Sequence, residues 1–194
     1  MPDALRAVKT LVYGGAVNDR LTKADWIRQG LRTLAGNGPS GLKVGSMSAS
    51  LNVSRGSFYW HFRDITEFRS HLLRDWQERT TDQFILDLEA ENAAPDRLKF
   101  LLRRAFNEKR NMDRAIRAWG AEDADVAATV AAVDAKRVAY MAKLLTAAGV
   151  PTKAARDRAT FLYWAYLGQT IIMDASLSSI AASAIDDLSD LLET

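Results

Sequence analysis

The densest group of residues that could do chemistry lies between Lys43 and Phe62, where the chain reads KVGSMSASLNVSRGSFYWHF. An arginine at the start of a helix can reach a guanine edge with two hydrogen bonds, worth about 1–3 kcal/mol of discrimination between bases. Hydroxyl, imidazole and lysine donors suit phosphate oxygens, which position a protein on DNA without reading its sequence. The segment therefore predicts a nucleic-acid contact surface.

Position around a helix separates the two kinds of contact. At about 100° per residue, Phe58 and Phe62 share one face, which we assign to the core. Gly56 and Trp60 fall on the opposite face, where a glycine lets the backbone approach a DNA groove closely. We expect base contacts from Arg55, Gly56, Ser57 and Trp60, and phosphate contacts from Lys43, Ser46, Tyr59, His61 and Arg63.

Local signals delimit the helices that must position these residues. Thr22 followed by Asp25 is typical of a capping box and predicts the start of a first helix, which the run Gly36-Asn37-Gly38-Pro39 ends. A short second helix contains Val44, Met47 and Leu51, and Asn52 suits a left-handed turn after it. Ser54 is then placed to cap a third short helix. Two short helices around a tight turn, after an amphipathic helix, indicate a helix-turn-helix.

The remaining chain predicts an all-α protein, because apolar residues recur at helical spacing and strand-like alternation never lasts. Asp64 opens a long fourth helix whose apolar residues continue to Leu88. Pro95 suits the first turn of another helix, and further helices are expected over about 125–145, 152–175 and 178–192. We predict an N-terminal arm (1–20), a three-helix DNA-binding head (21–66) and a helical regulatory and dimerisation domain (67–194). The head and the body are expected to share the fourth helix.

Charge is divided unevenly between these parts. Residues 1–70 contain ten Lys/Arg and five Asp/Glu, a net charge of +5, whereas the rest of the chain contains 16 and 19, a net charge of −3. A basic head on an acidic body is the pattern expected when only the head contacts a polyanion.

The segment Asn-Val-Ser-Arg-Gly-Ser-Phe-Tyr-Trp-His-Phe (52–62) resembles the recognition-helix signature of the TetR family of bacterial regulators. The family's Tyr-x-His-Phe run falls on Tyr59, His61 and Phe62, and the resemblance covers roughly residues 21–70. Two positions depart from it. Asn52 stands where many members have a turn glycine, and Ile65 stands where many have a lysine that contacts phosphate.

The resemblance implies a homodimer that binds a near-palindromic DNA operator and uses the last two helices of each subunit as its interface. The segment from Ala159 to Asp174 is apolar on nearly every side, which a soluble helix tolerates when it is covered on two sides. A membrane-spanning helix needs about 20 residues and few polar groups, and this segment is shorter and more polar than that. We therefore expect no membrane partner and a dimer interface formed by Phe161, Ala165, Gly168, Ile172, Ile180, Ala184, Leu188 and Leu191.

The resemblance also implies that an effector acts on the body. We expect a repressor released from its operator by a small molecule, whose identity the sequence does not give. The candidate pocket residues are the large body residues Trp76, Phe84, Phe106, Trp119, Tyr140 and Trp164. An alternative is a regulator controlled by a protein partner, which an absent cavity would favour.

An enzyme is a poor fit to the residues present. The chain has no cysteine and two histidines, and it lacks the paired carboxylate and histidine spacing of helical-bundle metal sites, so we expect no metal and no cofactor. The glycines at 36, 38 and 41 match a dinucleotide-binding pattern formally, but they follow a helix and include Pro39 rather than following a strand. The N-terminus lacks the basic and apolar regions of a signal peptide, and we expect a cytoplasmic protein.

Overall fold

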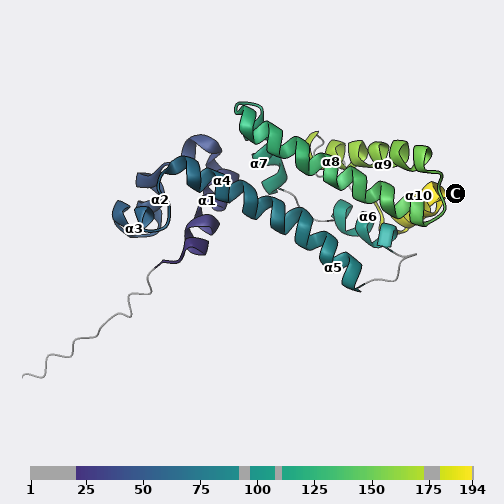
Figure 1. Ribbon diagram of the computed structural model, residues 1–194, viewed down its shortest axis with the longest axis horizontal. Helices are drawn as coiled ribbons and strands as arrows, with labels where there is room; N and C mark the ends of the chain where they lie inside the picture. Colours follow the sequence, from purple (N-terminus) through teal and green to yellow (C-terminus); the bar gives the residue numbers. More distant parts are fainter. Residues whose placement is uncertain (1–20, 92–96, 108–110, 173–179, 194) are drawn as a thin grey trace, which may run out of the picture.

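The computed structural model describes residues 21–91, 97–107, 111–172 and 180–193, and over these ranges the chain is helical without a strand (Figure 1). The head consists of α1 (Lys23–Asn37), the 3-10 turn η1 (Pro39–Gly41), α2 (Val44–Ser50) and α3 (Arg55–Tyr59). The body consists of α4 (Ile65–Gln77), the π-helical turn η2 (Glu78–Asp82), α5 (Gln83–Glu91), α6 (Arg97–Asn107), α7 (Asn111–Gly120), α8 (Ala124–Ala147), α9 (Thr152–Leu167), the π-helical turn η4 (Gly168–Ile172) and α10 (Ala182–Glu193). The predicted arm (1–20) and Pro95 lie outside the described residues.

The predicted start and end of the first helix are confirmed. The Thr22 hydroxyl accepts the backbone N–H of Asp25 and the Asp25 carboxylate accepts that of Thr22, which is a complete capping box. At the other end, Gly38 has φ of 67° and its N–H donates to the carbonyl of Leu34. This left-handed conformation favours glycine and turns the chain toward η1.

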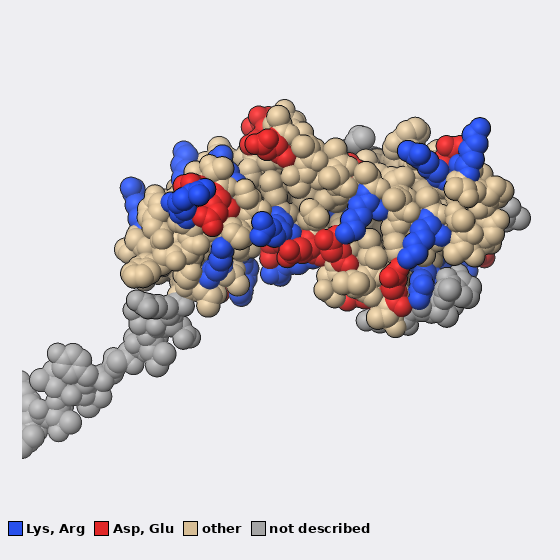
Figure 2. Space-filling view, in the orientation of Figure 1, with Lys and Arg blue, Asp and Glu red and all other residues tan. Residues whose placement is uncertain are grey.

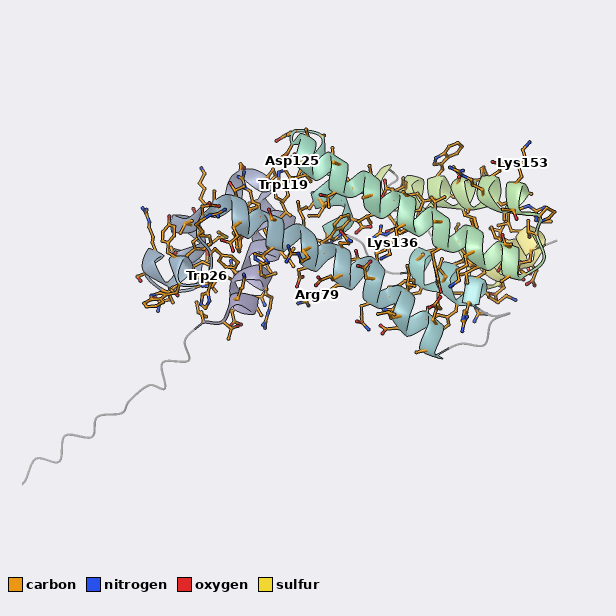
Figure 3. The ribbon with its side chains drawn as sticks, in the orientation of Figure 1. Trp26, Arg79, Trp119, Asp125, Lys136 and Lys153 are labelled. Carbon is orange, nitrogen blue, oxygen red and sulfur yellow. The ribbon has the colours of Figure 1, made fainter. Side chains whose placement is uncertain are left out.

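A cluster of aromatic rings forms the centre of the head. Phe58 lies 5.3 Å from Trp26 and 5.3 Å from Phe68, and Phe62 lies 4.9 Å from Phe68, all measured between ring centroids in edge-on arrangements. All four side chains are buried, and Trp26 is labelled in Figure 3. Edge-on aromatic pairs contribute about 0.5–1.5 kcal/mol each beyond the area they bury. The short α3 is therefore fixed by rings from α1 and α4.

The fourth helix consists of three segments, because α4, η2 and α5 follow one another without a break from Ile65 to Glu91 (Figure 1). The predicted long helix that opens at Asp64 and contains Leu88 is confirmed in this form. Its middle turn, Glu78–Asp82, is π-helical, a feature that the sequence pattern did not predict. Short π segments within α-helices are rare and occur frequently at functional sites.

The head and the body share a core. Trp119 of α7 and Val126, Val130 and Val133 of α8 belong to the same buried cluster as the aromatic rings of the head. Helix α1 also packs directly on α7. The predicted division at residues 66 and 67 therefore runs through continuous packing, and the head is mounted on the body by more than the fourth helix.

A second core fills the far end of the body, between α6, α8, α9 and α10. The predicted helices over 125–145 and 152–175 correspond to α8 and to α9 with η4, although residues 173–175 lie outside the described residues. The last helix begins at Ala182 rather than near 178. It is held to the neighbouring helices by an ion pair between Arg103 and Asp186 and by the Arg158 guanidinium, which donates to the carbonyl of Leu192 at 2.6 Å.

Replacing Gly30 by alanine is expected to lower the free energy of unfolding by about 1–3 kcal/mol, because an added methyl group overpacks the α1–α4 crossing. A Cβ at Gly30 would lie 2.5 Å from the ring of Phe68 and 2.8 Å from Leu72. Urea unfolding measures the change.

Gly36 supplies the matched control, since it lies in the same helix with nothing within 4 Å of an added Cβ. Gly36→Ala should leave stability unchanged or raise it by up to about 1 kcal/mol, the helix preference of alanine over glycine. Equal effects of the two substitutions would contradict the close packing of α1 on α4.

Candidate nucleic-acid interface

The turn between α2 and α3 has the geometry that the sequence predicted. Asn52 has φ of 53° and lies in the left-handed region that asparagine tolerates. The N–H of Asn52 donates to Ala49 at 3.1 Å, and the N–H of Val53 donates to Ser48 at 3.0 Å. Ser54 occupies the cap position of α3, but its side chain makes no capping hydrogen bond. The turn is thus held by backbone bonds rather than by a side-chain cap.

The predicted inward and outward faces are confirmed by burial, although α3 ends at Tyr59, so that Trp60 and Phe62 lie in the turn just after it. Phe58 and Phe62 are buried, whereas Trp60 is 80% exposed and Tyr59 is 58% exposed. Gly56 is also exposed, and Ser57 is half-buried. An exposed tryptophan beside basic residues does not contribute to the core, and it is suited to contact a partner molecule.

Arg55, at the first position of α3, lies against α2. A Cβ built on Gly45 would lie 2.9 Å from an Arg55 guanidinium nitrogen, so the absence of a side chain at Gly45 leaves room for the arginine. Gly45 was not among the residues predicted from the sequence. Arg55 as a whole is exposed, which leaves it available to a partner.

Two of the residues predicted to contact phosphate have partners within the protein. His61 is half-buried, and its Nε2 lies 2.7 Å from the carbonyl oxygen of Leu21, which ties the end of α3 to the residue before α1. A phosphate contact by His61 would therefore have to use Nδ1. Arg63 is exposed and donates to Asp64 at 3.0 Å, an ion pair that raises the pKa of Arg63.

Ile65 is the position where the resemblance led us to expect a missing phosphate contact. The side chain is half-buried and packs against the aromatic core of the head at the start of α4. Asp64 caps the same helix by accepting the N–H of Glu67 at 2.8 Å. Ile65 thus contributes an apolar side chain to the core shared by head and body, where the resemblance has a basic residue.

A polar groove lies between α1 and α2, beside the predicted phosphate-contacting residues Lys43 and Ser46. Its walls also include Arg32 and Gln29, two residues of α1 that were not predicted as contacts, because polar residues on an amphipathic helix are usually solvated. Lys and Arg side chains are visible around the head in Figure 2, with a few acidic groups among them. The groove adds donors to the same end of the molecule as α3.

The predicted dimer-interface residues belong to α9, η4 and α10, except Ile180, which precedes α10. Phe161 is 64% exposed and Leu191 is 69% exposed, while Ala165, Leu188 and Ile180 are also exposed, and Gly168 and Ala184 are half-buried. The side chain of Ile172 lies outside the described residues. Trp164, predicted for the pocket, is 65% exposed on the same helix as Phe161. Large apolar groups are thus gathered on one pair of helices.

A cavity of about 60 Å³ lies in the body, and three of the predicted pocket residues line it: Phe84, Phe106 and Tyr140. The other three lie elsewhere. Trp76 and Trp119 are buried in the core shared by head and body, and Trp164 is on the surface. Helices α5, α6, α8 and α9 and the π turn η2 contribute the remaining wall residues, which are Thr80, Thr81, Ile85, Leu101, Leu102, Ala105, Arg137, Met141, Leu162, Tyr163 and Tyr166.

A buried carboxylate lies next to this cavity. Asp113 of α7 is 1% exposed and accepts hydrogen bonds from the indole N–H of Trp76 at 2.7 Å, the guanidinium of Arg137 at 2.7 Å and the hydroxyl of Tyr166 at 2.8 Å. Burial by itself would raise the pKa of Asp113, but these donors outweigh it and the pKa is lowered from its ordinary value. The carboxylate is therefore ionised and fully engaged.

Arg137 connects Asp113 to the π turn. Its Nε donates to the Thr81 hydroxyl at 2.9 Å and its Nη2 donates to the Thr80 hydroxyl at 3.0 Å. Lys136 reaches the same turn with an ion pair to Asp82 at 2.8 Å, between α8 and the long helix in Figure 3. One signal in the sequence could have identified Arg137: it follows Val126, Val130 and Val133 at helical spacing, on the buried stripe of α8.

No family model and no curated protein matches the chain by sequence. Solved structures do match. A protein described as a TetR-family transcriptional regulator from a Rhodococcus species aligns with a TM-score of 0.62 at 16% identity, covering 89% of this chain and 98% of its own. A protein described as a fatty acid metabolism regulator from Clostridium perfringens aligns with a TM-score of 0.65 at 15% identity, covering 86% and 95%. The multidrug binding protein EbrR, complexed with imidazole, aligns with a TM-score of 0.57 at 16% identity, covering 88% and 93%.

The chain has the TetR-family fold. At this low identity the alignments establish the architecture, and they confirm the predicted all-α fold with its helix-turn-helix head. Within the described ranges no helix is long and apolar enough to cross a membrane. The same ranges contain no cluster of metal-ligating side chains.

Replacing Asp113 by asparagine is expected to lower the free energy of unfolding at neutral pH by about 3–5 kcal/mol, because Arg137 is left buried without its counter-charge. The effect should depend on pH. Since the folded-state pKa of Asp113 lies below its ordinary value, its contribution is present above about pH 4 and is lost as the pH falls through the folded-state pKa. Urea unfolding across the acid range measures this.

Asp157→Asn, at an exposed position of α9, is the matched control and should leave both the stability and its pH dependence close to those of the unaltered protein. The difference in stability between the unaltered protein and Asp113→Asn should shrink on acidification. A difference that stays constant with pH would show that the ionised carboxylate is not what stabilises this centre.

Proposed function

We propose that this protein is a DNA-binding transcription regulator that reads its operator with α3. The observation that carries the proposal is the pairing of a fully buried aromatic anchor, Phe58 and Phe62, with an outer face that presents Arg55, Gly56 and Trp60 to solvent. Lys43, Ser46 and Arg32 supply donors for the flanking phosphates. A DNA-binding role places the protein in the compartment that holds the DNA, which for a bacterial regulator is the cytoplasm.

The regulator acts as a homodimer joined through α9 and α10. Exposed Phe161, Trp164, Leu188 and Leu191 support this arrangement, because a monomer would leave these large apolar side chains in water. Two recognition helices then meet successive turns of the major groove, with half-sites about 34–36 Å apart.

A small molecule in the body cavity releases the protein from its operator, so that the protein represses in the absence of the effector. The cavity supports this mode over control by a protein partner, and Thr80 and Thr81 in its wall belong to the helix that leads to the head. An effector shifts the protein between two states only by the difference in its affinity for them. One neighbour of this fold is described as a multidrug binding protein, which agrees with an effector role for the body.

Replacing Arg55 by alanine is expected to weaken binding to the operator about 10- to 100-fold while binding to random DNA changes little, because a bidentate guanine contact discriminates between bases. The operator is first recovered by selecting bound fragments from genomic DNA. Fluorescence anisotropy at one fixed salt concentration then compares the two DNA sequences.

Lys43→Ala is the control for a phosphate contact. It should weaken binding to both sequences equally and reduce the salt dependence by about one counterion. An equal loss on operator and random DNA for Arg55→Ala would assign Arg55 to phosphate rather than to a base.

Replacing Phe161 by aspartate is expected to convert the dimer to a monomer at micromolar concentration, since a charge would be buried within the proposed interface. Light scattering coupled to size exclusion measures the mass. Leu86→Asp is the matched control, because Leu86 is 58% exposed on α5, away from α9 and α10, and this variant should stay dimeric. A monomeric unaltered protein would contradict the dimer.

A further inference from the structure

The body cavity has mainly apolar walls. Leu101, Leu102 and Ala105 of α6 face Met141 of α8 and Leu162 of α9 among its lining residues. Its free volume of about 60 Å³ is smaller than that of an engineered cavity of about 150 Å³ that holds benzene, but it is not fully enclosed. Methionine is the most adaptable apolar side chain, so Met141 can make room for an occupant. A slender apolar molecule fits these walls best.

The charged groups beside the cavity are already paired. Arg137 is the one charged side chain among the described lining residues, and it donates to Asp113, Thr80 and Thr81. Arg117 and Asp134 do not line the cavity, and they are paired with each other: Arg117 Nη1 donates to Asp134 Oδ2 at 2.9 Å. An anionic ligand would have to draw Arg137 away from a buried carboxylate, and a cationic ligand would meet a carboxylate that already accepts three hydrogen bonds. Both arrangements leave a buried ion without its partner, which is strongly unfavourable.

The hydroxyl groups in the wall are also bonded, with one exception among the described residues. Tyr166 donates to Asp113 at 2.8 Å and Tyr163 donates to Asp134 at 2.6 Å, while Thr80 and Thr81 accept from Arg137. Tyr140 is different: it is 7% exposed, and its buried hydroxyl has no hydrogen-bond partner in the described part of the chain. Buried hydroxyl groups are nearly always paired, and each exception calls for an explanation.

We infer that the cavity binds an uncharged, mainly apolar molecule with a single hydrogen-bonding oxygen, and that Tyr140 is the residue that pairs with that oxygen. The inference rests on the proposed function, since it names the chemical class of the effector. Burial, and secondarily the carboxylate of Glu89, raises the pKa of Tyr140, so its hydroxyl keeps its proton and can donate to the ligand. Medium-chain alcohols, phenols and ketones belong to this class.

The test uses three six-carbon probes that differ in charge: hexan-1-ol, hexanoate and hexylammonium. NMR chemical-shift titration of the full-length protein without DNA gives a Kd for each. We expect hexan-1-ol to bind at least tenfold more tightly than either ion. Tighter binding of hexanoate would show that Arg137 is the anchor, tighter binding of hexylammonium would show that Asp113 is, and the absence of binding by all three would remove the site; each result would overturn the inference.

Two variants connect the binding to the cavity. Tyr140→Phe should weaken hexan-1-ol about three- to tenfold, the effect of one hydrogen bond, while the melting temperature of the free protein stays the same or rises. A purely structural Tyr140 would instead lower the melting temperature and leave the Kd unchanged, which would contradict its role. Ala105→Leu should fill the cavity and abolish binding with the helical circular-dichroism spectrum retained. Undiminished binding to this variant would place the probe elsewhere and overturn the inference.

The outcome is separable from the proposed function because the titration contains no DNA. A protein that binds its operator but none of the probes would contradict only the effector class. A protein that binds hexan-1-ol through Tyr140 but no operator would contradict only the proposed regulator.

Discussion

The arrangement of the body depends on how one buried carboxylate is neutralised. Asp113 comes from α7, and its partners come from three other helices: Trp76 from α4, Arg137 from α8 and Tyr166 from α9. A buried ion that loses a partner destabilises a protein by several kcal/mol, whereas the intact pair adds little net stability. The centre therefore acts mainly as a positional constraint. It tolerates only packing arrangements in which all four helices bring their groups to the same point.

The π turn of the long helix is explained by the same centre. Arg137 reaches past Asp113 to the hydroxyls of Thr80 and Thr81, and Lys136 binds Asp82 in the same turn. Thr80 also donates to the carbonyl of Trp76 at 2.7 Å, inside the helix itself. A π turn contains one residue more than a turn of regular α-helix, and each residue corresponds to a rotation of about 100°. A regular helix here would therefore turn these threonines away from Arg137. The irregular turn is thus the conformation that keeps a buried guanidinium fully bonded.

Local signals in the sequence were sufficient for the elements of the head. The capping box at Thr22, the left-handed Asn52 and the inward spacing of Phe58 and Phe62 depend on neighbours within a few residues, so a single sequence contains the information. The same holds for Gly38, whose positive φ ends α1. The exposed residues of this segment followed from the buried ones, because positions that differ by about 180° around a helix lie on opposite faces.

Features that depend on distant partners were not predictable. The contact of His61 Nε2 with the carbonyl oxygen of Leu21, 40 residues earlier, has no local signal, and the phosphate contact of His61 stays a prediction. Asp113 gave no local sign of burial, because its three donors lie 24 to 53 residues away in the sequence. Trp119 was expected in a pocket, but it lies in a core that crosses from body to head. In each case the residue type was informative, and the partner that decided its role came from the tertiary fold.

The cavity lies between a rigid side and a compliant side, and this asymmetry bears on how an occupant could act. Arg137, Tyr163 and Tyr166 are held by charged hydrogen bonds, so moving them would unpair buried groups. The apolar wall from α6 can move without unpairing a buried polar group, but such a movement does not displace the head. The π turn is different from both, since Thr80 and Thr81 line the cavity and belong to the helix that enters the head. An occupant that presses on the cavity wall therefore reaches the head through this turn and, by way of Arg137 and Asp113, through α7, which packs on α1. The hydrogen bonds of Arg137 to Asp113, Thr80 and Thr81 resist movement along both routes.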